Sequence, residues 1–171
     1  MRFLSPSAAC LLVLAALISA PRAAGAELID NFGDWSAFQQ NEDGKPLCWI
    51  ASEPNKTEGN YTQRGNAYVV VTHRPSEQSL GVISFAAGYD YKKDSLVELT
   101  IGKDTYPMFT DGGFAWREDH KSDMELVRAM SRGYAMIVKG TSERGTKTTD
   151  TYSLKGFTDA YKAINKACGI E

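Results

Sequence analysis

One serine of this chain lies in a glycine-bounded segment that could form a hydrolase site. Gly140-Thr-Ser-Glu-Arg-Gly145 places Ser142 near the middle of the segment. A nucleophile elbow is Gly-x-Ser-x-Gly on a turn from a strand to a helix, whereas this segment has one extra residue and its flanks are typical of two strands. The pattern therefore favours a polar hairpin loop from Thr141 to Thr146. A small hydrolase with a site near Ser142 or His73 stays as the alternative.

The histidines and the acidic residues have no spacing that predicts a metal site or an acid–base pair. His73 ends an expected strand and His120 precedes an expected helix, without an H-x-H or an i, i+4 arrangement. A histidine at the end of a strand is more often a hydrogen-bonded structural residue than a catalytic base. Carboxylates such as Asp150 and Asp159 are not predicted to meet at the separation that glycosidases need. We therefore expect no metal, no cofactor and no catalytic residue.

The C-terminal part of the chain is basic beside an acidic body. From Arg132 to Ala167 there are seven basic and three acidic residues, whereas from Glu27 to Ser131 there are 10 basic and 17 acidic residues. A basic face of this kind could bind an anionic partner such as a lipid headgroup or an acidic protein surface. The alternative is a solvated face without a partner. The candidate residues are Arg144, Lys147, Lys155, Lys162 and Lys166.

The N-terminus has the features of a secretory signal peptide over residues 1–26. Arg2 precedes an apolar run from Leu11 to Ile18, and Ala24-Gly-Ala26 offers a small-residue cleavage site. The apolar run is too short to span a bilayer, so we expect no transmembrane segment after the signal is removed. Cleavage would leave residues 27–171, which is the size of one domain. Acidic residues outnumber basic ones in that part, which argues against a nucleic-acid partner.

The two cysteines of the mature chain are expected to form a disulfide bond, because the chain is expected to be exported. Cys10 lies in the expected signal peptide, which leaves Cys48 and Cys168 in the mature chain. An even number of cysteines in an oxidising compartment predicts a disulfide bond between them. The alternative is two buried free thiols. The spacing excludes a C-x-x-C redox pair, and two cysteines cannot supply a four-cysteine metal site.

Short apolar runs rich in Val, Ile, Tyr and Phe, bounded by Gly, Pro, Asn or Asp, predict a mainly β protein. We expect an antiparallel β-sandwich of Ig-like architecture, because turns are frequent and strands do not alternate with helices. The expected strands are Trp35 to Phe38, Leu47 to Ala51, Tyr68 to His73, Leu80 to Phe85, Leu96 to Ile101, Tyr106 to Phe109, Phe114 to Trp116, Tyr134 to Lys139 and Thr148 to Leu154.

Two helices are expected in addition to the strands. Ser122-Asp-Met-Glu125 has the form of a capping box, and Gly133 follows where a left-handed residue would end a short helix. From Phe157 to Cys168 apolar residues recur at helical spacing, and Gly169 follows as a stop. The C-terminal helix should therefore carry its cysteine on the buried face.

The segment from Glu53 to Asn66 is polar and is expected to be an exposed loop. It contains two N-x-[ST] sequences, at Asn55 and Asn60. In a eukaryotic secreted adhesion domain, which is a further alternative, these asparagines would carry glycans.

A long block from Lys139 to Phe157, followed by a segment that ends at Cys168, is the most specific part of the sequence. Shorter segments accompany it at Asn31-Phe-Gly-Asp-Trp35, Leu47-Cys-Trp-Ile-Ala-Ser52, Val71-Thr-His-Arg-Pro75, Ala87-Gly-Tyr89 and Ala115-Trp116. Together they resemble the invasion-associated locus B family of bacterial envelope proteins. The resemblance implies a non-enzymatic virulence protein of the periplasm or cell envelope, or a secreted one. It would contribute to host-cell invasion or envelope interactions by binding an unknown protein or envelope component.

Overall fold

The computed structural model describes residues 25–170, which form an 11-stranded sheet with two α-helices and one short 3-10 turn. The predicted signal peptide lies almost wholly outside the described residues. The strands are β1 (Glu27–Phe32), β2 (Trp35–Glu42), β3 (Lys45–Ser52), β4 (Lys56–Gly59), β5 (Tyr68–Arg74), β6 (Ser79–Ala86), β7 (Leu96–Ile101), β8 (Asp104–Asp111), β9 (Phe114–Trp116), β10 (Ala135–Thr141) and β11 (Lys147–Ser153). The helices are α1 (His120–Met130) and α2 (Phe157–Ala167), and the 3-10 turn is η1 (Pro75–Glu77).

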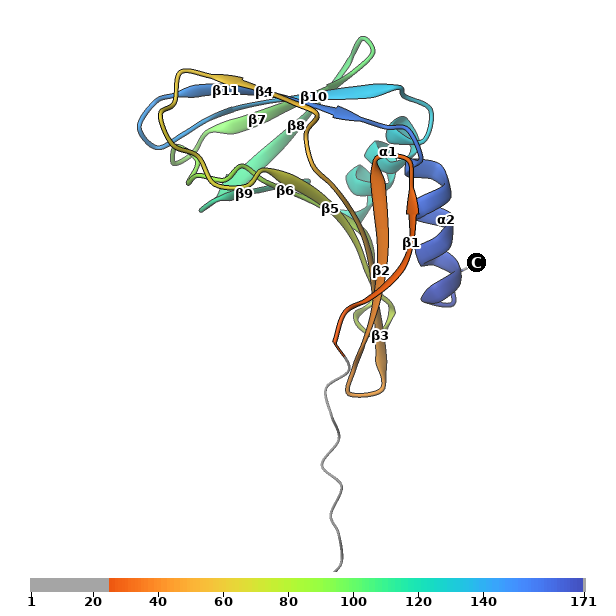
Figure 1. The fold of residues 1–171 in the computed structure, drawn as a ribbon. Coiled ribbons are helices and arrows are strands. Elements are labelled where there is room, and N and C mark those ends of the chain that lie inside the picture. The colour runs from red at the N-terminus through yellow and green to blue at the C-terminus, as the bar shows by residue number, and fades with distance from the viewer. Residues whose placement is uncertain (1–24, 171) are drawn as a thin grey trace, which may run out of the picture.

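All paired strands are antiparallel, in the order β1-β2-β3-β5-β6-β9-β8-β7-β10-β11-β4. The sheet folds over itself, so that β7, β8, β10 and β11 form an upper layer and β5, β6 and β9 lie below it (Figure 1). The expected mainly β, antiparallel class with a short helix and a C-terminal helix is confirmed. The two layers of the expected sandwich belong to one continuous sheet, joined where β8 pairs with β9.

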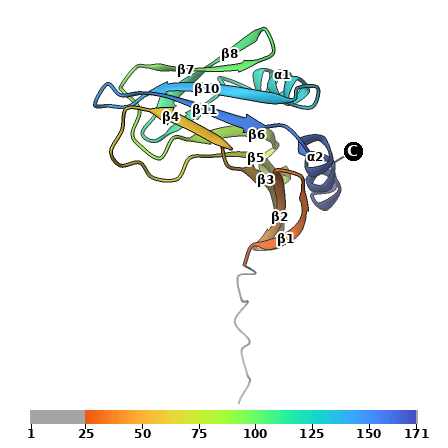
Figure 2. The ribbon, with the colours of Figure 1, turned by 45° about the horizontal axis from the view of Figure 1, so that its top comes forward.

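The core lies between the layers and is built from alternate residues of each strand. In β5 Val69 and Val71 are fully buried. Val70, which lies between them, and Thr72, which follows Val71, are half-exposed on the other face. This period of two is the consequence of strand pleating. Helix α1 closes the open side of the two layers and α2 packs against β1, β2 and β3 (Figures 1 and 2). The largest fully buried side chains are Trp35, Tyr152, Phe85, Phe157, Ile50, Ile83, Leu99, Met108, Leu126, Met130, Met136 and Ile164.

The nine predicted strands are all present, with ends that differ by a few residues, but β1 and β4 were not predicted. β4 lies inside the segment that was expected to be a loop, and all of its residues are exposed. β1 has no buried residue and pairs only with β2 at the edge of the sheet. Neither strand shows apolar alternation, so the sequence carries no periodic signal for them. β4 is exposed throughout, and in β1 Ile29 and Phe32 pack against the core but are not two residues apart.

The N-cap of α1 lies three residues before the predicted one, so the capping prediction at Ser122 was wrong. Asp119 is the N-cap: its carboxylate accepts the Ser122 N–H at 2.8 Å, and the Ser122 Oγ accepts the Asp119 N–H at 3.1 Å. An acidic N-cap also interacts favourably with the positive end of the helix dipole. Gly133 is not a left-handed cap either. A Cβ there would lie 2.6 Å from the Ile101 side chain and 2.7 Å from that of Leu154, so close packing requires the glycine.

Helix α2 is fixed to the sheet by a disulfide bond and by aromatic packing. Cys168, directly after the helix, is bonded to Cys48 of β3, which confirms the predicted pair. The rings of Trp35 and Phe157 pack edge to face with centroids 4.9 Å apart. No helix formed by residues 25–170 has the length and apolar character that crossing a membrane requires.

Candidate functional site

Ser142 closes the hairpin between β10 and β11. Its N–H donates to the Thr146 carbonyl at 2.9 Å, and its Oγ accepts the Thr146 N–H at 3.1 Å. The predicted polar hairpin loop is therefore confirmed, and residues 142–146 form it. No histidine lines the pocket beside Ser142 within the described part of the chain. The hydroxyl thus has a structural partner in the hairpin.

His73 is buried beneath α2, at a different place from Ser142. Its Nδ1 accepts the Gly81 N–H at 2.9 Å, so the ring proton is on Nε2, which donates to Asn165 Oδ1 at 2.8 Å. Burial lowers the pKa of His73, although the hydrogen bond to Asn165 opposes that shift. Both ring nitrogens of a neutral imidazole are therefore engaged in fixing β5 to β6 and α2. The structure does not bring His73 and Ser142 into one site.

The five basic residues of the candidate anionic-partner surface are all exposed but lie in two groups. Arg144 and Lys147 are at the hairpin end of β11, whereas Lys155 follows the opposite end of that seven-residue strand. The strand separates them by roughly 20 Å. Lys162 and Lys166 lie one turn apart on α2, beyond Lys155. An anionic partner would therefore meet one group or the other, and its existence stays a prediction.

A polar pocket of about 540 Å³ opens where three loops meet at the hairpin end of β11. The loops are residues 60–66, residues 87–92 and residues 142–146, and we call the cavity the three-loop pocket. The side chains that give it its polar character are Asn60, Gln63, Tyr89, Asp90, Glu143 and Arg144.

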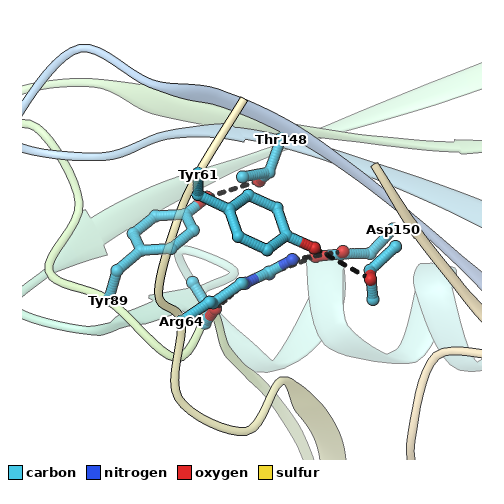
Figure 3. Close-up of polar contacts among 7 residues, drawn as sticks. Tyr61, Arg64, Tyr89, Thr148 and Asp150 are labelled. Carbon is cyan, nitrogen blue, oxygen red and sulfur yellow. Dashed lines mark hydrogen bonds and ion pairs between the residues drawn. The ribbon is translucent and has the colours of Figure 1, made fainter. Parts of the chain in front are cut away.

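The floor of the three-loop pocket is Arg64, which forms a buried ion pair with Asp150 of β11. The two guanidinium NH₂ groups donate to the two carboxylate oxygens at 2.7 and 2.6 Å, and Nε donates to the Ala87 carbonyl at 2.7 Å (Figure 3). Only 5% of the Arg64 side chain and 6% of the Asp150 side chain are exposed. A bidentate pair of this geometry is strong and directional. Arg64 therefore connects its own loop, residues 60–66, to the loop of residues 87–92 and to strand β11.

Two tyrosines flank the Arg64 guanidinium, as Figure 3 shows. The Arg64 carbon Cζ lies 5.5 Å from the ring centroid of Tyr61 and 5.1 Å from that of Tyr89, which are cation–π distances. Burial disfavours the charged guanidinium, but the hydrogen bonds and charge of Asp150 outweigh it, and the pKa of Arg64 is raised. Burial also raises the pKa of Tyr89, whose hydroxyl lies 2.6 Å from Thr148 Oγ1. Arg64 therefore keeps its charge and Tyr89 keeps its proton around neutral pH.

Glycines allow the first two loops to touch. The Gly65 N–H donates to the Gly88 carbonyl at 2.8 Å, and Gly88 has a left-handed φ of 73°. A Cβ on Gly88 would lie 2.2 Å from the Gly65 carbonyl oxygen, which no side chain can tolerate. The third loop is tied to the second, because the Glu143 N–H donates to the Asp90 carbonyl at 2.8 Å. The walls of the three-loop pocket are thus held in place without a ligand.

No pattern in the sequence predicts the three-loop pocket. Arg64 lies in the segment that was expected to be an exposed loop, but its side chain is buried. Asp150 is one of many acids in the sequence, and 86 positions separate it from Arg64. Tyr89 belongs to the segment Ala87-Gly-Tyr89, which carries the family resemblance but predicts no contact. Because the contacts join distant segments of the chain, no local pattern reports them. Asn55 and Asn60 are exposed, and glycans on them stay a prediction.

The chemistry that the three-loop pocket offers is recognition through hydrogen bonds. Asp90, Glu143 and Arg144 are exposed at its rim, and its floor is neutralised internally by the Arg64–Asp150 pair. No group of three or more His, Cys, Asp and Glu side chains that could hold a metal ion occurs among residues 25–170.

Comparisons with known proteins agree with this fold. The family model "Invasion associated locus B (IalB) protein" matches residues 35–165. The crystal structure of invasion associated protein B from Bartonella henselae superimposes with a TM-score of 0.52 at 18% sequence identity, covering 80% of this chain and 94% of that chain. No curated protein matches the chain in sequence. Because the family model extends over most of the sequence, the chain belongs to the invasion associated locus B family.

Proposed function

We propose that this chain is an exported protein of the periplasm or cell envelope that acts by binding a partner and not by catalysis. In this proposal residues 1–26 are a signal peptide, residues 27–171 are the single mature domain, and binding contributes to host-cell invasion or envelope interactions. Membership of the invasion associated locus B family supports the role. The Cys48–Cys168 disulfide supports an oxidising compartment, since such bonds are rare where thiols are kept reduced.

The three-loop pocket is the observation that carries the proposed binding role. Its three loops are fixed by a buried ion pair and by backbone hydrogen bonds, so binding need not order them. Ser142 and His73, which a hydrolase would use, are both occupied by structural hydrogen bonds. A rigid, polar, open pocket without an activated nucleophile is suited to recognition.

A complementation assay tests this proposal. A deletion strain of the source organism would receive the wild-type chain or the Asp90→Asn/Glu143→Gln variant, both of whose changes are exposed at the rim. We expect the variant to accumulate normally in the envelope fraction and to restore host-cell invasion or envelope integrity at least about tenfold less well, as for a loss of about 1.4 kcal/mol in binding.

The matched control is Glu98→Gln/Asp104→Asn, which makes the same charge change at exposed residues of β7 and β8 outside the pocket. Full complementation by both variants would contradict a binding role for the three-loop pocket. Recovery of the wild-type chain mainly in the cytoplasm would contradict the proposed location.

A further inference from the structure

We infer that the three-loop pocket binds a neutral saccharide. This inference rests on the proposed binding role of the same pocket and adds the chemical class of its ligand. The pocket volume of about 540 Å³ lies within the range of about 300 to 1,000 Å³ that is usual for small-ligand sites.

The rim has the side chains that recognise neighbouring hydroxyl groups. Each sugar hydroxyl both donates and accepts, so it needs partners of both kinds. The carboxylates of Asp90 and Glu143 accept hydrogen bonds through two oxygens each, and the Arg144 guanidinium only donates. The amides of Asn60 and Gln63 do both. Planar groups with paired donors or acceptors can each engage two adjacent hydroxyls of one ring.

The charge balance of the pocket favours a neutral ligand over an anion. Arg64 is paired with Asp150 on the floor, so its positive charge is already neutralised. Arg144 is the one cation that remains among the described lining residues, and it shares the rim with Asp90 and Glu143. A phosphate or sulfate group would therefore meet more negative than positive free charge. An uncharged polyhydroxyl ligand has no such repulsion and can use all three side chains.

Tyr61 and Tyr89 add aromatic surface to the polar rim. Both line the pocket and are partly exposed, although Arg64 occupies one side of each ring. The C–H groups of a sugar ring can pack against the exposed part of such rings. A second group of aromatic side chains lies on β8 and β9, where Phe109 and Phe114 pack near Trp116 with ring centroids 5.8 and 5.6 Å away. The three-loop pocket differs from that group because polar side chains that can bind hydroxyl groups surround its two tyrosines.

Because the loops of the pocket are already ordered, a ligand that makes only weak polar contacts can still bind measurably. The Arg64–Asp150 pair and the Gly65–Gly88 contact hold the loops in the absence of a ligand. Little conformational entropy is then lost when the ligand binds. We expect dissociation constants of about 1 mM or below for a suitable oligosaccharide, which calorimetry and NMR titration can measure.

The experiment is a titration of the mature, disulfide-bonded protein with a defined set of probes. The neutral probes are tetrasaccharides of N-acetylglucosamine, glucose, mannose and galactose. The anionic probes are a sulfated heparin tetrasaccharide and inorganic phosphate. At least one neutral tetrasaccharide should bind, with chemical-shift changes centred on residues 60–66, 87–92 and 142–146.

Two variants decide whether binding occurs at this site. Asp90→Asn/Glu143→Gln should weaken the neutral saccharide at least about tenfold, a change of about 1.4 kcal/mol. Glu98→Gln/Asp104→Asn, outside the pocket, should leave its affinity unchanged. Circular dichroism and thermal melts of both variants check that the fold is retained.

Three results would overturn the inference: no neutral tetrasaccharide binds at millimolar concentration, only the sulfated tetrasaccharide or phosphate binds, or the pocket variant binds as well as the wild type. The complementation assay separates this inference from the proposed function. If the titration gives any of these three results but Asp90→Asn/Glu143→Gln still fails to complement, the proposed binding role stands and the pocket binds another ligand. Saccharide binding combined with full complementation would instead support the ligand class and contradict the proposed role.

Discussion

At the scale of single residues, the Arg64–Asp150 pair organises the candidate site and should be the most sensitive to change. Replacing Arg64 by Met leaves the Asp150 carboxylate buried without its partner, since both side chains are at most 6% exposed. Removing one partner of a buried ion pair costs about 3 to 5 kcal/mol. Urea unfolding at pH 7 should show a loss of that size for Arg64→Met.

The double variant Arg64→Met/Asp150→Leu is the control for this prediction. It removes both charges and fills the space with apolar groups, which in buried pairs is often neutral or stabilising. We expect it to recover more than half of the stability lost in Arg64→Met. A loss below about 1 kcal/mol in the single variant would mean that water reaches the carboxylate, and the pair would not be a fixed floor.

Asp123 of α1 should make the protein less stable as the pH rises from about 4 to about 6. Burial raises the pKa of Asp123 to about 6, although the Ile83 N–H, Arg117 and His120 oppose the shift. In that window the unfolded chain has already lost the proton that the folded chain keeps, so folding stability falls with pH. Its carboxylate accepts the Ile83 N–H at 3.1 Å, and Asn can accept the same bond.

Asp123→Asn should therefore raise stability at pH 7.5 by about 2 to 3 kcal/mol, the equivalent of a shift of about two pKa units. The measurement is urea unfolding of both proteins between pH 4 and pH 7.5. His73, whose pKa is lowered by burial, contributes a dependence of the opposite sign, but it is present in both proteins and cancels in the difference. A difference that is independent of pH would refute the assignment to Asp123.

At the scale of elements, the sequence predicts the helices and strands that bury apolar residues in a regular pattern. It gives no signal for strands that lack such a pattern. β7 was predicted closely because apolar side chains alternate along it, and β5 because a short continuous run of apolar, β-branched residues is typical of a strand. β1 and β4 were missed because they are edge strands without buried residues. The start of α1 was predicted too late because both Asp119 and Ser122 are residue types that favour the N-cap. Ser122 is instead the third helical residue, which completes the capping box with Asp119. Tertiary contacts select between such alternatives, and the sequence alone does not.

The C-terminal helix should be the first element to detach when the disulfide is removed. α2 has 11 residues, which is marginal for a helix alone in water. The bond joins residues 120 positions apart, and in the chain-entropy model such a crosslink contributes on the order of 5 kcal/mol. Cys48→Ala/Cys168→Ala should lower the melting temperature. Hydrogen exchange should show residues 157–167 losing protection before β10 and β11, which serve as the internal control.

An unchanged melting temperature in the double cysteine variant would contradict this account. So would loss of protection in the sheet before α2. Packing of Phe157 and Ile164, both fully buried, contributes to docking as well, so some native α2 should remain at low temperature.

At the scale of the whole molecule, the continuous sheet brings loops from distant parts of the chain together at one end. The residues of the three-loop pocket come from the first, second and last thirds of the described chain, and β11 links them through Asp150 and Thr148. The mainly β class and the disulfide could be predicted, because composition and cysteine count report them directly. The site could not, because it depends on which loops the strand order places side by side.

The start of β1 supports a specific position for signal cleavage. Glu27 is the first residue of β1 and pairs with Gln39 of β2, so cleavage after Ala26 would leave every strand residue in place. Cleavage several residues later would remove the pairing of Leu28 with Phe38 and shorten the edge of the sheet. N-terminal sequencing of the natively exported protein should therefore begin at Glu27, within a few residues. Intact Met1 as the main species in the soluble cytoplasm, with Cys48 and Cys168 reduced there, would refute export.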